Sequence, residues 1–457
     1  MDSGNRAPDK SETENRFLRW PSAILGPMPG IQEINLACWS VVAAIFVTRF
    51  CLPVWIQYKA GRGSIPLFPN DFVYFYGIGQ IAKDFPASRL YDYSLQLKTF
   101  NEIYQLPARA YGPSPYPPFV ALFFSLFARV SFRVAFFAWT VCSLLLYCMG
   151  ITAAARDFFP RDRVKISLIL CLAIAFYPFF WGIVVNGQLS AVAVCALGIT
   201  VYLERRSKLF QSGLALSVLA YKPTLLLLLV PMLFLTRRFK TLAGFAAGAA
   251  ALTLLGTAFG GIAIWPEFMR FLKLFGQLTG MNAQSSLLLY KFVDLNSFLL
   301  AMGGGRSTPE MAIFALITIS IGTVLGVLLW KSAKGGWPVQ SLAWATTITW
   351  TLLLNVYVPM YDSVLVALAA VLAFGAVKEN GWSAAINWVA SISVSIFAVS
   401  WVSYDIARDR HIQLLSLAIA FFGLVELYIL HRMIGRGKQL EPASIAQAKG
   451  LSKGTPG

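Results

Sequence analysis

The residue types that most often carry out catalysis are scarce in this chain. It has two histidines, His411 and His431, which argues against a zinc site or a histidine-based catalytic triad. The six cysteines fall in or beside apolar segments and show no CxxC or Cys/His spacing, so we interpret them as small buried residues. No GxxxxGK[ST] or GxGxxG loop opens a helix after a strand. The sequence therefore predicts no metal, no cofactor and no bound nucleotide.

Polar residues between apolar runs are the remaining candidates for chemistry. Lys222 lies beside Pro223 at a depth where a lone ammonium is costly unless it faces a cavity or an anion. The alternative is a lysine that snorkels at a short turn. Asn186 and Gln188 occupy another tight turn, where neutral amides either bind ligand hydroxyl groups or only cap the turn. The sequence does not decide between these interpretations.

The elements that must position these residues are set by the composition. Of the 457 residues, 57% are hydrophobic and 13% are charged, more apolar surface than a soluble fold of this size can bury. Apolar stretches of about 17 to 25 residues recur along the chain, and each can cross a bilayer as a helix. We therefore predict an all-α, polytopic integral membrane protein with membrane lipid as its solvent.

The net charge of +17 could indicate a nucleic-acid partner, but its distribution indicates membrane topology instead. Lys and Arg cluster in short turns between apolar runs, and such loops stay cytoplasmic. We predict no nucleic-acid partner and two cytoplasmic termini. The clusters are Arg156/Arg161/Arg163/Lys165, Arg205/Arg206/Lys208, Arg237/Arg238/Lys240, Lys331/Lys334 and His431/Arg432/Arg436/Lys438.

This rule divides the chain into a cytoplasmic tail at 1–33, a transmembrane domain at 34–430 and a disordered cytoplasmic tail at 431–457. Two long polar segments, 57–133 and 265–308, fall outside, and their amphipathic pieces at 72–83, 94–104 and 118–129 favour the membrane interface. We predict about 12 crossings. They lie near 34–56, 134–153, 165–184, 187–203, 211–221, 223–236, 241–264, 309–330, 339–357, 361–377, 383–402 and 411–430.

An ordered set of short motifs resembles glycosyltransferase family 87 over roughly residues 66 to 378. The motifs are Asn70-Asp71-Phe72-Val73-Tyr74-Phe75-Tyr76, Leu90-Tyr91-Asp92, Tyr116-Pro117-Pro118-Phe119, Asn186-Gly187-Gln188-Leu189-Ser190, Gly213-Leu214-Ala215-Leu216, Tyr221-Lys222-Pro223 and Arg237-Arg238. The resemblance implies the GT-C membrane fold and a polyprenyl-phosphate sugar as donor.

The resemblance also implies that Asp71, in the first external loop, is the general base for the acceptor hydroxyl. A sugar hydroxyl is a weak nucleophile, so a carboxylate within hydrogen-bond reach must take its proton. The alternative is that Asp71 only caps a helix that begins at Phe72. Asp92, Asp84 and Asp362 are the second-choice carboxylates.

The leaving polyprenyl phosphate requires a fixed cation nearby. Lys222 is the first candidate, with Arg270, Lys291 and Arg306 as alternatives from the second external segment. Some members of the family have a histidine in the external turn that corresponds to 355–362, where this chain has Tyr357 and Tyr361. The predicted substrate-binding residues are Asn70, Tyr74, Tyr116, Asn186, Gln188, Lys222, Arg270, Lys291, Tyr361 and Asp362.

The resemblance thus implies an inverting transferase of the inner (plasma) membrane with its active site on the extracytoplasmic side. It would move a hexose, mannose being the preferred choice, from a polyprenyl-phosphate donor to a glycolipid or glycan acceptor. A lipid or sugar transporter or flippase would have similar spans, but the chain shows no clear inverted halves. A polysaccharide–lipid ligase would share the topology and use a diphosphate donor.

Overall fold

The structure is a computed structural model, and it describes residues 71–104, 113–160, 162–281, 288–303 and 308–451, together with Leu36, Trp39, Ser40, Ala43 and Val47. The predicted tail at 1–33 lies outside the described residues, as does most of the predicted first crossing. Within the described part every regular element is a helix, and an isolated bridge joins Phe292 to Pro359. The prediction of an all-α protein is confirmed.

The helices follow the predicted apolar runs closely. The first half contains α4 (Phe72–Asp84), α5 (Tyr93–Tyr104), α6 (Pro118–Ser125), α7 (Phe132–Arg156), α8 (Arg163–Ala175), α9 (Tyr177–Phe179), η4 (Phe180–Val185), α10 (Ser190–Arg205), α11 (Leu209–Ser217), η5 (Val218–Tyr221), η6 (Pro223–Leu226) and α12 (Leu229–Leu235). The second half contains α13 (Phe239–Gly260), α14 (Ile264–Met281), η8 (Leu289–Lys291), α15 (Leu295–Met302), α16 (Thr308–Ser332), α17 (Trp337–Leu353), η9 (Met360–Val364), α18 (Leu365–Asn380), α19 (Ser383–Arg410) and α20 (Leu414–Leu451).

Six of the described helical segments are long and apolar enough to cross a membrane, and the bent pair α8–η4 gives a seventh. They indicate a membrane protein. The predicted count of about 12 crossings is not confirmed. The helices α10 and α17, with 16 and 17 residues, rise only about 24 to 26 Å against a core of roughly 30 Å. The six segments are Phe132–Arg156, Phe239–Gly260, Pro309–Ser332, Met360–Asn380, Ser383–Arg410 and Leu414–Gly435.

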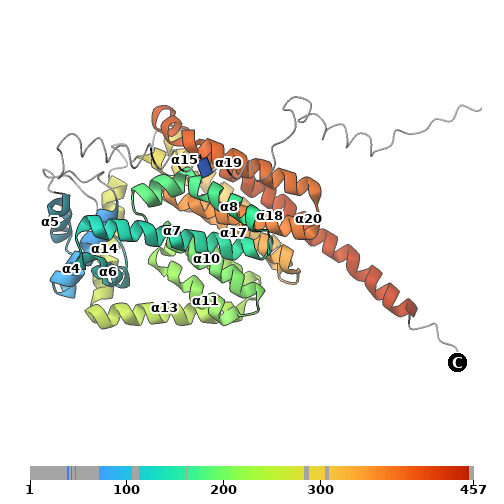
Figure 1. Cartoon of the computed structure of the whole chain (residues 1–457), viewed down its shortest axis with the longest axis horizontal. Helices are drawn as coiled ribbons and strands as arrows, with labels where there is room; N and C mark the ends of the chain where they lie inside the picture. Colours follow the sequence, from blue (N-terminus) through green and yellow to red (C-terminus); the bar gives the residue numbers. More distant parts are fainter. Residues whose placement is uncertain are drawn as a thin grey trace, which may run out of the picture.

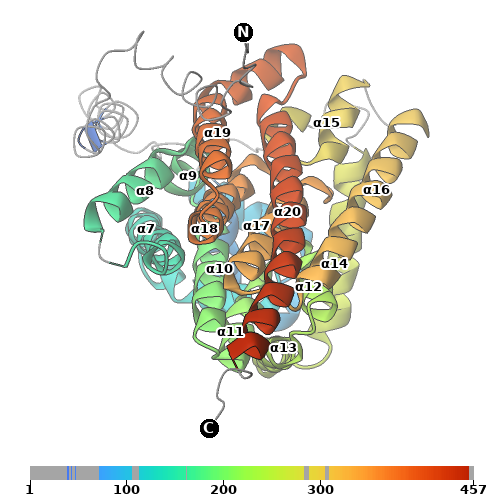
Figure 2. The same cartoon turned by 90° about the vertical axis from the view of Figure 1, so that its right-hand side faces the viewer.

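The long helices run side by side, and α4, α5, α6 and α14 gather at one end of the bundle (Figure 1). A view turned by 90° shows α17 among the other helices and α7, α8, α13 and α16 at the periphery (Figure 2). Accordingly, α17 is buried from Ser341 to Leu353, whereas α13 buries only four of its residues. The core therefore lies around α10, α17 and α18, and the peripheral helices present apolar side chains outward.

Two segments differ from the prediction. The run predicted as one crossing at 165–184 bends by 59° between α8 and the α9–η4 segment. Pro178 explains the break, because proline has no N–H to continue the helix ladder. The second difference is the C-terminal tail, predicted to be disordered, where α20 continues to Leu451. Residues such as Ala446, Gln447 and Ala448 favour helix, which the charge of the tail obscured.

Candidate active site

Asp71 lies at the point where the first described helix begins. It occupies the position before α4, yet its side chain makes no capping hydrogen bond to that helix. Its carboxylate instead accepts a hydrogen bond of 2.7 Å from the Nε2 of Gln188, 117 residues further along the chain. The side chain of Asp71 therefore does not cap α4, and the capping interpretation is wrong. The carboxylate faces a second polar segment at the same end of the bundle.

The turn before Gln188 is shaped by Gly187. The backbone of Gly187 has φ +73°, and a Cβ there would lie 2.8 Å from the Cβ of Phe72. Only glycine combines that φ with such close approach. The indole of Trp139 on α7 donates a 2.9 Å hydrogen bond to the Gly187 carbonyl and fixes the turn from the other side. Gln188 is 5% exposed, and its Oε1 has no hydrogen-bond partner among the described residues.

The break between η5 and η6 places Lys222 beside a second carboxylate. The ammonium of Lys222 forms an ion pair with Asp362, which is 1% exposed, and lies 5.1 Å from the ring centroid of Tyr361. Asp362 also accepts a 2.6 Å hydrogen bond from the hydroxyl of Ser190, at the start of α10. Lys222 therefore has a buried anion and an aromatic face as partners, the condition under which a lysine at this depth is tolerated.

The segment 188–190 connects the two carboxylates, because Gln188 bonds to Asp71 and Ser190 bonds to Asp362. Tyr116 lies near both of them. Burial raises the pKa of its phenol, and the nearby charges of Asp362 and Asp71 and the phenol of Tyr74 act in the same direction. The Tyr116 hydroxyl consequently stays neutral and can donate a hydrogen bond at any physiological pH. Asp71, Gln188, Ser190, Lys222, Tyr116, Tyr361 and Asp362 thus form one group, which we call the Asp71–Asp362 cluster.

The loop that carries Tyr361 and Asp362 is held by two further residues. Asn355 donates a 2.7 Å hydrogen bond from Nδ2 to the carbonyl of Thr224, just after Lys222. Asp294, at the start of α15, accepts a 2.8 Å hydrogen bond from the backbone N–H of Val358 and caps its own helix through the N–H of Ser297. Burial raises the pKa of Asp294 to about 6, although these hydrogen bonds oppose the shift. The segment at 288–303 therefore braces the loop that carries Asp362.

Comparison with known families decides where the chain belongs. The family model described as "Glycosyltransferase family 87" matches residues 115–359, more than half of the sequence. The chain belongs to glycosyltransferase family 87. The resemblance inferred from the ordered motifs is confirmed. The matched range includes Tyr116, Gln188 and Lys222, and it leaves out Asp71 and Asp362. No curated protein and no solved structure matches the chain.

The structure places the other predicted site residues of this family 87 protein in different surroundings. Asn186 donates its amide to the Trp181 carbonyl at 2.8 Å, which is a local turn contact. Arg270 is 71% exposed and pairs with Glu267 on α14, and Lys291 lies 5.9 Å from the ring of Tyr290. Asp92 pairs with Arg89 at 2.8 Å. None of these contacts joins the cluster, and Asn70 and Arg306 lie outside the described residues.

Three residues that hold the cluster were missed as functional candidates. Ser190 belongs to the cluster, and Asp294 and Asn355 bond to its neighbours Val358 and Thr224. All three do so through pairings across more than 60 residues, which spacing in the sequence does not reveal. Asp294 does have a local signal, since Asp before Leu-Asn-Ser is a typical helix N-cap. In the part of the chain that the structure describes, no three His, Cys, Asp or Glu side chains come together as metal ligands.

Proposed function

We propose that this glycosyltransferase moves a hexose, mannose in the first instance, from a polyprenyl-phosphate donor to an extracytoplasmic glycolipid or glycan. The observation that carries the proposal is the Asp71–Asp362 cluster. It combines a carboxylate that is oriented by an amide with an ammonium that is held beside aromatic rings. A displacement at an anomeric carbon requires these two groups, one for the nucleophile and one for the leaving group.

Asp71 acts as the base in this mechanism. As the acceptor oxygen attacks the anomeric carbon, its proton passes to the carboxylate of Asp71, and a new C–O bond forms. The bond from the anomeric carbon to the phosphate oxygen breaks, and the polyprenyl phosphate leaves with the electron pair. A single displacement of this kind inverts the anomeric configuration. Gln188 supports the step because its Nε2–H holds the carboxylate in one orientation.

Lys222 balances the negative charge that grows on the leaving phosphate. Asp362 and Ser190 orient it, and the Tyr361 ring covers one side of its ammonium. Lys222 supplies one positive charge, and Asp362 already pairs with it. A phosphodiester with a single negative charge therefore fits at lower electrostatic cost than a diphosphate. This balance favours a polyprenyl-phosphate donor over the diphosphate donor of a ligase.

Amides and phenols around the cluster suit a sugar. The Oε1 of Gln188 is buried without a partner among the described residues, so an acceptor hydroxyl that bonds to it removes a desolvation penalty. The neutral Tyr116 hydroxyl supplies a donor next to both carboxylates. These groups bind hydroxyl-rich ligands without the solvation cost of additional charge.

The test is sugar transfer by purified protein in lipid vesicles, with a crude extracytoplasmic glycolipid fraction as acceptor. Four radiolabelled donors are compared: polyprenyl-phosphate mannose, polyprenyl-phosphate glucose, GDP-mannose and a polyprenyl-diphosphate sugar. We expect label to move only from polyprenyl-phosphate mannose. Transfer from GDP-mannose alone, or from the diphosphate donor alone, would overturn the proposal that the donor is a polyprenyl-phosphate sugar. Transfer from polyprenyl-phosphate glucose and not from the mannose donor would correct the sugar and keep the class.

A further inference from the structure

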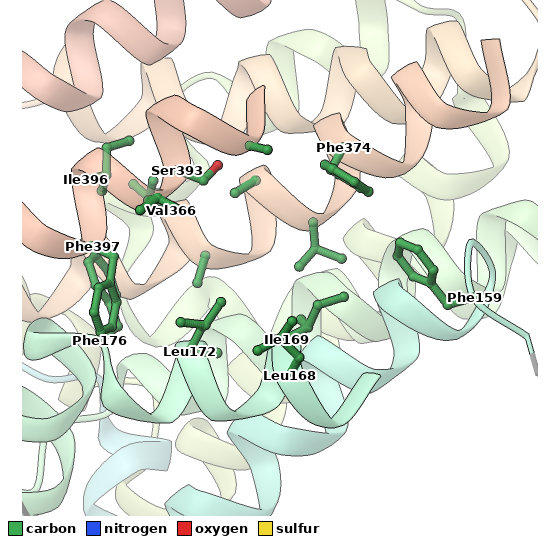
Figure 3. Close-up of a pocket in the computed structure, with 16 residues that line it drawn as sticks. Phe159, Leu168, Ile169, Leu172, Phe176, Val366, Phe374, Ser393, Ile396 and Phe397 are labelled. Atoms are coloured by element: carbon green, nitrogen blue, oxygen red, sulfur yellow. The ribbon is translucent and has the colours of Figure 1, made fainter. Parts of the chain in front are cut away.

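A hollow lies between α8, α18 and α19, away from the residues discussed so far (Figure 3). Its volume is about 340 Å³, at the lower end of the roughly 300 to 1,000 Å³ of small-molecule sites. Phe176 and Phe397 lie at one end in Figure 3, and Phe159 lies at the other. The rings of Phe159 and Phe374 stack with centroids 6.0 Å apart and close that second end.

The lining of the hollow is hydrocarbon. Four alanines, Ala173, Ala367, Ala370 and Ala390, leave the space that larger side chains would fill. Ser393 is the one hydroxyl among the lining residues, and it donates its hydrogen bond to the Val389 carbonyl on its own helix. The hollow therefore offers no free polar group to a ligand, and only an apolar chain or ring gains by entering it.

The hollow is open to the membrane side of the protein. Its lining residue Val394, on α19, is 61% exposed, so the space reaches the molecular surface. Helix α19 belongs to the segment Ser383–Arg410, which is long enough to cross the bilayer. A chain can thus enter sideways from the surrounding lipid, without passing through the core of the bundle.

One end of the hollow lies near the part of the chain that carries Asp362. Val366 lines this end and lies four residues after Asp362, about one helical turn further along the chain. Phe176 lines the same end and directly precedes the α9–η4 segment, which leads to Gln188. From Val366 to Phe374 the hollow extends about 12 Å along α18. This end of the hollow is therefore the one nearer in sequence to Asp362, the partner of Lys222.

Trp39 contacts α8 on a face away from the hollow. The indole of Trp39 donates a 3.1 Å hydrogen bond to the hydroxyl of Ser167. Residues two positions apart on a helix point about 200° apart, so Ser167 faces away from Ile169, which lines the hollow. This contact therefore does not involve the lining of the hollow.

We propose that the isoprenoid chain of the sugar donor lies in this hollow, its first few units between α8, α18 and α19 and the remainder in the surrounding lipid. The assignment rests on the proposed function, because it takes the phosphate to be at Lys222. It adds a lipid-binding site to the transferase on a face that the external amphipathic helices do not form.

The direct test is photo-crosslinking, which needs no catalysis. A polyprenyl phosphate without sugar, carrying a diazirine on an isoprene unit near the phosphate, is irradiated with the purified protein in phospholipid vesicles. We expect labelled peptides to come from 168–176 and 390–397, and labelling to fall when unlabelled polyprenyl phosphate competes. Labelling confined to other helices, or labelling that phospholipid alone suppresses equally, would overturn the assignment. Neither result would count against sugar transfer.

A filling variant tests the same site by kinetics. Ala370→Phe occupies the hollow, and Ala247→Phe adds the same ring at an exposed position of α13 as a matched control. We expect Ala370→Phe to raise KM about tenfold for a long-chain donor, and to leave transfer from a donor with a two-isoprene chain within twofold of wild type. An unchanged KM for the long-chain donor would overturn the proposal. Equal loss with both donors, with Ala247→Phe normal, would also overturn it.

Discussion

At the scale of single residues, the carboxylate of Asp71 and the amide of Gln188 form one unit. Because the Gln188 Nε2–H donates to Asp71 while Gly187 and Trp139 fix the turn, the orientation of this carboxylate, the proposed base, is set before any substrate binds. Pre-organisation of this kind lowers the barrier without any new contact to the acceptor.

Replacing Gln188 by Leu should therefore lower kcat about tenfold and leave the donor KM within twofold, because the lost hydrogen bond orients the base. The matched control is Gln413→Leu, a buried glutamine that bonds to the Tyr290 carbonyl elsewhere. If donor KM rises and kcat stays constant, Gln188 binds sugar and does not position the base.

The Lys222–Asp362 pair gives a second prediction. Lys222→Met leaves the Asp362 carboxylate buried without its ammonium and should destabilise the protein by roughly 3 kcal/mol. The double variant Lys222→Met/Asp362→Asn should recover most of that stability in thermal unfolding but remain inactive in transfer. A double variant with wild-type transfer would exclude Lys222 as the group that holds the phosphate.

Sequence reasoning located part of this site. Lys222 was predicted because a lysine between apolar runs requires a partner. Asp71 was predicted because it lies in the Asn70–Tyr76 motif that resembles the family. The partners themselves could not be predicted. Asp362 pairs with Lys222 across 140 residues and Gln188 with Asp71 across 117, and only the packing of α10 against the α4 and η9 ends brings them together.

At the scale of elements, the segment at 288–303 acts as a brace. Its residues 292–294 pair with the loop before η9 through the Phe292–Pro359 bridge and the Asp294–Val358 hydrogen bond. The segment contributes no residue to the cluster, but it contacts the loop that leads directly to Asp362.

Asp294 makes the brace sensitive to pH. Its pKa of about 6 lies above the ordinary value of 3.8, so its contribution to stability is complete below about pH 4 and is lost as the pH rises through 6. The total change is about 3 kcal/mol. The unfolding midpoint of wild type should therefore exceed that of Asp294→Asn by more at pH 5 than at pH 8. A difference between the two midpoints that grows with pH would contradict the raised pKa of Asp294.

Helix positions were predictable from apolar periodicity and from the proline and basic turns, as the bounds of α4, α7, α13 and α16 illustrate. The short apolar helices on either side of Lys222 were also predicted, at 211–221 and 223–236, and they lie at Leu209–Tyr221 and Pro223–Leu235. The prediction missed the bend at Pro178, because hydrophobicity averaged over a window does not show where a proline breaks the helix.

At the scale of the whole molecule, the cluster and the basic turns lie at opposite ends of the same helices. Helix α10 begins at Ser190 in the cluster and ends at Arg205, and the Met360–Asn380 segment runs from Asp362 to Lys378. This polarity agrees with an extracytoplasmic site and cytoplasmic basic loops.

The topology can be tested with two exposed positions. Lys98→Cys on α5 should react with a membrane-impermeant maleimide in intact cells. Lys334→Cys, after α16, should react only after permeabilisation, and the unsubstituted protein serves as the blank. The reverse pattern would place the cluster in the cytoplasm and would exclude an extracytoplasmic transferase.

The most direct test of the account is the transfer rate of Asp71→Asn, with polyprenyl-phosphate mannose as donor and wild type assayed in parallel. If Asp71 is the base, kcat should fall by about 10² to 10⁴, while the thermal midpoint and donor binding remain those of wild type. If the variant transfers mannose at the wild-type rate, Asp71 is not the base, and the proton must go to another carboxylate, with Asp362 or Asp92 next to be tested.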